Sequence, residues 1–222
     1  MVSQRNELDY QPLPTSKADS ASRSQGTYSR LEAINAVLSS EPVSPRVGMD
    51  IGSHIGFFSI NLAKQGMLVH AVESNKERLL LSFLLARQEK VPLAPMPLRV
   101  DKSSVDILPE ADVTLCLSVW HHWVRHYGLE DATHILQTVI DKTRRLVFFD
   151  SGEEEMPAIY KLPYVNESSA AFFTRYLEQF AGVGESLDLG RHQAISPADK
   201  SGVRRNVFRT LYCLRKNPSA FA

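Results

Sequence analysis

Short apolar runs alternate with amphipathic stretches along most of this chain of 222 residues. The runs that are rich in branched and aromatic residues predict strands, and apolar residues spaced three and four positions apart predict helices. The predicted strands cover 46–51, 68–72, 98–100, 113–117, 146–149, 185–189 and 207–214. The first predicted helix begins near residue 28. The others cover 57–64, 76–89, about 130–142, and a region around 172–180.

This order of elements predicts an α/β fold. Strands that alternate with helices favour a parallel sheet, and the last two strands follow each other without a helix between them. We therefore expect a mainly parallel sheet of about seven strands with an antiparallel edge strand and helices on both faces. In the helix over 76–89, the residues expected to face the sheet are Leu79, Leu80, Phe83 and Leu84.

The two ends of the chain differ from its middle. Residues 1–27 are rich in Ser, Gln, Asp and Pro and lack periodicity, which predicts a flexible arm. A single domain is then expected over 28–216, followed by a short tail over 217–222. No apolar run approaches the length of a membrane span, and the first residues do not resemble a secretory signal. A cytoplasmic protein is therefore expected.

Composition narrows the classes of partner. The formal net charge is +0, so nucleic acid is not an expected partner. Cys116 and Cys213 lie in apolar runs, which indicates core residues rather than a disulfide or a metal pair. A basic cluster near the C-terminus is interpreted as a solvated strand face; it consists of Arg204, Arg205, Arg209, Arg215 and Lys216.

The most informative stretch joins the first two predicted strands. The first strand ends in Asp50, a turn with Gly52 and Gly56 follows, and the second strand ends in Glu73. A carboxylate at this second position can hold ribose hydroxyls, so the unit indicates a nucleoside-containing cofactor. His54 replaces the middle glycine of the dinucleotide fingerprint, and no Lys-Ser or Lys-Thr pair completes a phosphate-binding loop. The alternative is that the glycines only shape a tight turn.

The pattern Asp-x-Gly-x-x-x-Gly at residues 50–56 resembles motif I of the class I methyltransferases that depend on S-adenosylmethionine (SAM). The resemblance implies the Rossmann-like methyltransferase fold and SAM as cofactor. It also implies a set of cofactor-binding residues: Asp50, Gly52, Ser53, Gly56, Glu73, Asp101, Lys102 and Ser118. Asp101 is expected to receive the adenine amino group, although an aspartate after a strand is also a common turn residue. Tyr28 and Arg30 are candidates to meet the cofactor's carboxylate.

A second motif follows the fourth predicted strand. The segment Leu-Ser-Val-Trp-His-His over 117–122 resembles motif IV of a subgroup that includes polysaccharide-chain-terminating methyltransferases of O-antigen synthesis. This resemblance implies methyl transfer to a phosphate or hydroxyl oxygen of a small or glycan-linked acceptor. His122 and His121 are the catalytic candidates, because a histidine can serve as general base for a hydroxyl. The candidates for substrate binding are Trp120, Asp150 and Glu153, with core packing or a solvated loop as the structural alternative.

Other functions remain open at this point. His122 and His126 share a helix face, but no glutamate lies between them and no cysteine is near, so we expect no metal site. Methylation of an RNA or nucleotide end is an alternative that the neutral charge disfavours. A catalytically inactive SAM-binding scaffold is another. The sequence does not predict the oligomeric state.

Overall fold

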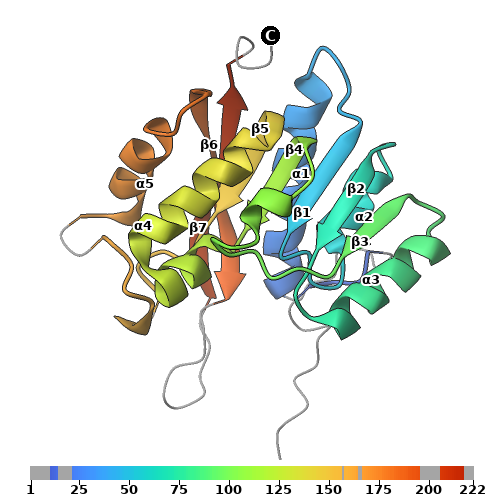
Figure 1. Cartoon of the computed structure of the whole chain (residues 1–222), viewed down its shortest axis with the longest axis horizontal. Coiled ribbons are helices and arrows are strands. Elements are labelled where there is room, and N and C mark those ends of the chain that lie inside the picture. The colour runs from blue at the N-terminus through green and yellow to red at the C-terminus, as the bar shows by residue number, and fades with distance from the viewer. Residues whose placement is uncertain (1–10, 15–21, 157, 165–166, 196–205, 218–222) are drawn as a thin grey trace, which may run out of the picture.

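The computed structural model describes residues 11–14, 22–156, 158–164, 167–195 and 206–217. Its centre is a seven-stranded sheet in the order β3-β2-β1-β4-β5-β7-β6 (Figure 1). The strands are β1 (Val47–Ile51), β2 (Leu68–Val72), β3 (Leu93–Met96), β4 (Ala111–Leu117), β5 (Thr143–Asp150), β6 (Val183–Ile195) and β7 (Asn206–Lys216). The first five strands are parallel to one another, and β7 is antiparallel to both β5 and β6. The predicted α/β fold is confirmed.

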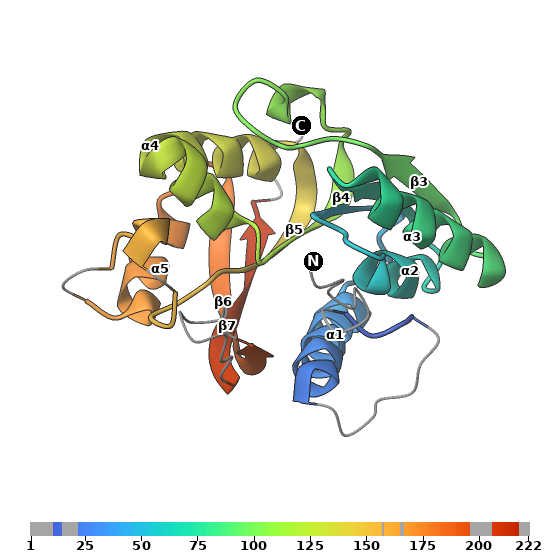
Figure 2. The ribbon, with the colours of Figure 1, turned by 90° about the horizontal axis from the view of Figure 1, so that it is seen from below.

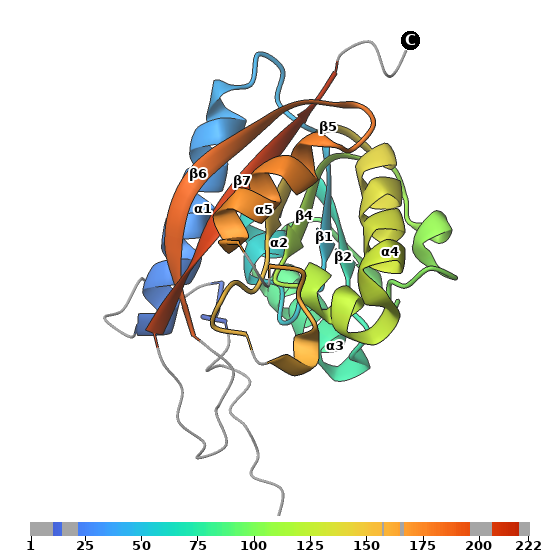
Figure 3. The ribbon, with the colours of Figure 1, turned by 90° about the vertical axis from the view of Figure 1, so that its left-hand side faces the viewer.

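Helices cover both faces of this sheet. They are α1 (Ser22–Ser40), α2 (Phe57–Ala63), α3 (Lys76–Gln88), α4 (Trp120–Asp141) and α5 (Ser169–Glu178), with short 3₁₀ turns η2 (Val105–Ile107) and η3 (Ala158–Tyr160). Figure 2 shows α1, α2 and α3 on one face and α4 and α5 on the other. Figure 3 shows α1 running alongside β6, where the two elements are in contact. Among the described residues, no helix has the length and apolarity needed to cross a membrane.

Each face of the sheet has its own apolar core. Trp120, Phe149 and Phe173 are fully buried between the sheet and the α4–α5 layer. Phe57 and Phe148 lie in the second core, between the sheet and the α1–α2 layer. Cys116 belongs to the first core and Cys213 to the second, and both are buried free thiols. Their predicted role as small core residues is confirmed.

The predicted third strand was wrong. Residues 98–100 form no strand, and β3 lies earlier, where Pro95 opposes Ala71 of β2. Proline cannot donate to a ladder, so it is tolerated only at an edge, and β3 is the edge of this sheet. Two further boundaries moved because glycine interrupted the pattern. Gly128, with φ 86° and ψ 169°, breaks the helical backbone of α4, which begins ten residues earlier than predicted. Gly190 lies in a bulge of β6, which therefore extends well beyond 185–189.

The buried face of α3 also differs from the prediction. Leu80 and Leu84 are 58% and 54% exposed, and the helix instead buries Leu79, Ser82 and Ala86. The reason is close packing against the turn after β1. A Cβ atom built on Gly56 would lie 2.1 Å from Ser82 Oγ, so only small side chains fit on this side of α3.

The N-terminal boundary lies earlier than the periodicity suggested. The first helix begins at Ser22, whereas its apolar spacing is visible only from about Tyr28. Part of the predicted arm is packed on the domain: Phe57 donates its backbone N–H to Gln11 Oε1 at 3.4 Å, and Lys64 Nζ donates to the Pro14 carbonyl at 3.3 Å. Residues 1–10 and 15–21 lie outside the described residues.

Candidate functional site

A cavity lies at the carboxyl ends of β1 and β4. These neighbouring strands are the point where the sheet order reverses, which is the usual ligand position in open α/β sheets. Helices α1 and α2, strands β6 and β7, and Gln11 supply the rest of the wall. The lining residues are Gln11, Thr27, Arg30, Asp50, Gly52, Phe58, Leu117, Ser118, Gln193, Ala194 and Arg209. Three of the predicted cofactor residues therefore meet here, namely Asp50, Gly52 and Ser118.

Asp50 is a buried carboxyl group at the end of β1. Ser59, in the following helix, donates its hydroxyl to Asp50 Oδ2 at 2.5 Å. Burial raises the pKa of Asp50 to about 6, against the lowering effect of the Ser59 bonds, and the nearby Glu73 charge adds to the rise. Burial therefore destabilises the charged form of Asp50 by more than the hydrogen bond from Ser59 stabilises it.

The turn after β1 requires its glycines. Gly52 and Gly56 have φ of 74° and 84°, in the left-handed region, and a Cβ on Gly52 would lie 2.8 Å from Val119 Cγ2. The backbone N–H groups of Gly52 and Ser53 both donate to the Val72 carbonyl, at 2.8 and 3.1 Å. This leaves the turn tied to the end of β2. The Ser53 hydroxyl is buried in it without a hydrogen-bond partner among the described residues.

Glu73 braces the same turn from β2. Its Oε2 accepts the backbone N–H of His54 at 3.0 Å, and its Oε1 accepts that of Asn75 at 2.8 Å. The side chain is buried, in line with a structural part in the site. Oε1 also accepts the Ser74 hydroxyl at 3.3 Å, so Oε2 is the oxygen that can shape the turn and still accept from a hydroxyl group of a ligand.

Asp101 and Lys102 lie on the loop after β3 and are not among the residues that line the cavity. Asp101 Oδ1 accepts the backbone N–H of Ser103 at 2.9 Å and its hydroxyl at 2.6 Å. The Ser103 hydroxyl, helped by the other hydrogen bonds of the turn, holds the pKa of Asp101 below its usual value. Lys102 Nζ pairs with Asp131 of α4 at 2.6 Å and is largely exposed.

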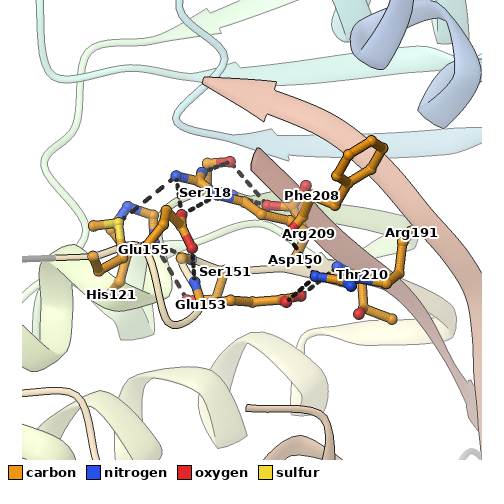
Figure 4. A network of polar contacts seen from close by, with 12 residues as sticks. Ser118, His121, Asp150, Ser151, Glu153, Glu155, Arg191, Phe208, Arg209 and Thr210 are labelled. Carbon is orange, nitrogen blue, oxygen red and sulfur yellow. Dashed lines mark hydrogen bonds and ion pairs between the residues drawn. The ribbon is translucent and has the colours of Figure 1, made fainter. Parts of the chain in front are cut away.

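Asp150 joins three elements behind the cavity. Its Oδ1 accepts the backbone N–H of Ser118 at 2.7 Å and the Ser118 hydroxyl at 2.9 Å. Its Oδ2 pairs with Arg30 Nη1 of α1 at 2.6 Å, and the carboxylate is fully buried. Figure 4 shows Asp150 beside Ser118 in this network. The aspartate therefore fixes the end of β4 and anchors the helix that covers the site.

Each glutamate of the acidic run over 153–155, after β5, has its own hydrogen-bond or ion-pair partner. Glu153 accepts the Thr210 backbone N–H and pairs with Arg191 Nη2 at 3.4 Å, and its burial raises its pKa (Figure 4). Glu154 accepts the N–H of Ser169 at the start of α5, at 2.6 Å. Glu155 pairs with Arg209 at 2.9 Å. The run joins the loop to β6, β7 and α5.

Arg209 is the residue that the sequence interpretation missed. It was placed on a solvated strand face, which is wrong for this position: Arg209 is 8% exposed, and its Nη1 donates to Ser118 Oγ at 3.3 Å. The alternation along β7 carried the signal, because Arg209 shares a sheet face with Leu211 and Cys213, both in the α1–α2 core. Arg204 and Arg205 lie outside the described residues.

The two histidines at the start of α4 have different surroundings. His121 is buried, and its Nδ1 accepts the Gly152 backbone N–H at 3.0 Å, so its neutral ring carries the proton on Nε2. Burial, and then the nearby His122 and Arg209 charges, hold its pKa well below the usual value. His122 lies at the surface against Tyr160, and partial desolvation, with the charges of His126, Arg125 and Arg209, lowers its pKa to about 4.

Trp120, which precedes the two histidines, lies in the core. Trp120 is fully buried among the aromatic side chains of α5, and its Nε1 donates to Tyr176 Oη at 3.0 Å. It can influence a substrate only through the residues packed against it.

Comparison with known proteins adds to this geometry. No family model matches the chain. A curated Escherichia coli protein, the O-antigen chain terminator bifunctional methyltransferase/kinase WbdD, is 26% identical over 109 residues. The match covers 48% of this chain and only 15% of that protein. A crystal structure of WbdD superimposes with a TM-score of 0.67 at 22% identity, covering 96% of this chain and 45% of the other.

The chain has a Rossmann-like methyltransferase fold. Magnesium protoporphyrin IX methyltransferase from Synechocystis PCC 6803, solved with bound SAM, also matches, with a TM-score of 0.58 at 13% identity. That match covers 93% of this chain and 88% of the other. At these identities the likeness establishes the fold, while the activity, cofactor and acceptor have to be argued from the site.

Proposed function

We propose that this protein is a SAM-dependent methyltransferase that transfers a methyl group to an oxygen, of a phosphate or a hydroxyl, on a small or glycan-linked acceptor. One observation carries the proposal. In a chain with a methyltransferase fold, the cavity at the reversal point of the sheet is lined by Asp50, Gly52 and Ser118, which lie at the carboxyl ends of β1 and β4, the strands of motifs I and IV. The partial match to an O-antigen chain terminator supports a glycan-linked acceptor.

The residues around the cavity fit the cofactor. Glu73 retains lone pairs for the ribose hydroxyls, and the Ser53 hydroxyl is a buried polar group that lacks a partner within the described part of the chain. Arg30 lines the cavity and offers a cation to the cofactor's carboxylate. When bound, SAM supplies a methyl group on a positively charged sulfur, which an acceptor oxygen can displace.

The protein's part in such a reaction is alignment and exclusion of water. Helix α1 covers the cavity and is fixed there by the buried pair between Arg30 and Asp150. The Ser118 hydroxyl is held by Asp150 on one side and Arg209 on the other. A rigid, covered site of this kind lowers the barrier by holding the reactants in line.

The ability of the two histidines to accept a proton affects which methyl acceptor the site can use. A hydroxyl acceptor needs a base, whereas a phosphate is already ionised. His121 uses Nδ1 to hold the loop after β5, which leaves His122 as the candidate base. Its pKa of about 4 keeps it neutral at pH 7 but makes it a weak base. His122 is exposed and is not among the described residues that line the cavity, so we propose a phosphate acceptor, which needs no base, as the first to test.

The test is to measure formation of S-adenosylhomocysteine from SAM with phosphorylated and unphosphorylated glycans. We expect turnover with the phosphorylated set. His122→Ala should abolish any methylation of hydroxyls and only weaken methylation of phosphate, while His126→Ala, also exposed on α4, serves as the control. Equal losses of SAM affinity and turnover in the His122 variant would show a structural residue instead. Absence of turnover with every acceptor, despite SAM binding, would favour the scaffold alternative.

A further inference from the structure

We propose that Trp123 is a positioning residue for the cofactor: its indole fixes the loop that carries Asp101, and so sets the recognition of the adenine amino group. The proposal rests on the proposed function, because it assumes that the ligand is an adenosine. It concerns α4, which contributes no residue to the cavity wall described above.

The contact is a single buried hydrogen bond. Trp123 Nε1 donates to the backbone carbonyl of Val100 at 3.0 Å. Trp123 is 3% exposed and Val100 is 7% exposed, and both belong to the core on the α4 side. Val100 lies four residues beyond the end of β3, where the sheet ladder no longer supplies hydrogen bonds. A buried carbonyl needs a partner, and here the indole is that partner.

The loop held in this way presents a carboxylate. Asp101 follows Val100 directly, and its Oδ1 accepts from Ser103 and, at 3.2 Å, from the Ser104 hydroxyl. Among the described residues, these hydrogen bonds all fall on Oδ1. Oδ2 is left able to accept from a ligand, and an exocyclic amine, such as that of adenine, is the donor that suits an ionised carboxylate.

The loop also lies at the correct edge of the sheet. Glu73 donates its backbone N–H to the Met96 carbonyl at 3.1 Å, so the end of β3 adjoins the residue assigned to the ribose. A second link to α4 exists between Lys102 and Asp131, but the lysine is 60% exposed. Exposed ion pairs contribute little, so the buried indole bond is the tie that decides the position of Asp101.

The test compares two tryptophans of the same helix. Trp123→Phe removes the bond to Val100, and Trp120→Phe removes an equivalent indole bond, to Tyr176 at 3.0 Å, away from the loop. Binding of S-adenosylhomocysteine and of its inosine analogue, which lacks the amine, is measured by calorimetry with thermal melting alongside. We expect the wild type to prefer the adenosine form, and Trp123→Phe to lose that preference by about fivefold, the value of one hydrogen bond. Trp120→Phe should keep it.

A second variant keeps the proposal falsifiable if Trp123→Phe does not fold. Asp101→Asn changes a half-buried side chain of the same loop, and its amide oxygen can still accept from Ser103 and Ser104. It should remove the preference for the adenosine form with only a small loss of melting temperature. If the Trp123→Phe variant folds, the double variant should lose no more preference than Asp101→Asn alone. An unchanged preference in Trp123→Phe, or in Asp101→Asn, overturns the inference. Failure of the wild type to bind either compound overturns the proposed function instead.

Discussion

Replacing Asp50 by Asn should make the protein more stable at neutral pH, although the residue lies in the site. The carboxyl group is buried at the end of β1, and within the described part of the chain its side-chain partner is the Ser59 hydroxyl at 2.5 Å. An amide oxygen can accept the same hydrogen bond. The substitution therefore removes the cost of burying a charge and keeps the contact.

The magnitude follows from the pKa. Burial raises the pKa of Asp50 from 3.8 to about 6. At about 1.36 kcal/mol per pH unit, this corresponds to about 3 kcal/mol. Because the folded protein binds the proton more tightly than the unfolded chain, stability from this group is present below pH 4 and is lost as the pH rises to about 6. The free energy of unfolding of the wild type, relative to Asp50→Asn, should fall by about 3 kcal/mol between pH 3 and pH 8.

The assay is urea unfolding of both proteins at several pH values. Asp112→Asn is the control with the opposite sign. Although partial burial raises the pKa of Asp112, the backbone N–H groups of Arg46 and Val47 and the Arg144 side chain lower it overall. Its stabilising effect should therefore be present at neutral pH and be lost as the pH falls below about 4. A difference between wild type and Asp50→Asn that does not change with pH would refute the reasoning.

Three further predictions concern packing and charge in the site. Gly56→Ala should destabilise the protein by about 3 kcal/mol or more, because Gly56 has a positive φ and a Cβ there would clash with Ser82. Gly66→Ala is the control: its φ is 91° but no atom lies within 4 Å, so it should cost only about 1–2 kcal/mol. Urea unfolding midpoints compare the two variants. Glu155→Gln should lower the melting temperature, because it leaves the buried cation of Arg209 without its charge partner. Adding Arg209→Met should restore part of the lost melting temperature. A double variant that melts below Glu155→Gln would contradict the pairing. Arg30→Met should weaken binding of S-adenosylhomocysteine more than that of adenosine, in calorimetric titrations, if Arg30 meets the cofactor's carboxylate; equal weakening of both would contradict that role.

The sheet and the motif I turn could be predicted from the sequence, because both depend on local pattern. Strand periodicity gave most of the parallel sheet, and the turn glycines stand where φ is positive. The edge strand β3 was misplaced because an edge tolerates Pro95, which is a strand breaker elsewhere. The buried face of α3 was misassigned because close approach of the Gly56 turn, a tertiary contact, excludes the larger leucines from that face.

The charged part of the site was less predictable. Arg209 looks like a surface residue in the sequence, and only the fold brings it to the cavity that Arg30, a predicted candidate, also lines. The partners of the acidic run are equally distant: Glu153 meets Thr210 of β7, and Glu154 meets Ser169 of α5. Spacing along a chain carries no information on such pairs. The indole bond of Trp123 is hidden for the same reason, since its acceptor is a backbone carbonyl.

The proposed function depends first on binding of an adenosine-containing cofactor by the turn after β1 and Glu73. The most direct measurement is titration calorimetry with S-adenosylhomocysteine on the wild type and on Glu73→Gln, with melting curves for both. We expect micromolar binding by the wild type and about tenfold or greater weakening in the variant while it remains folded. No binding by the folded wild type, or equal binding by the two proteins, would contradict it.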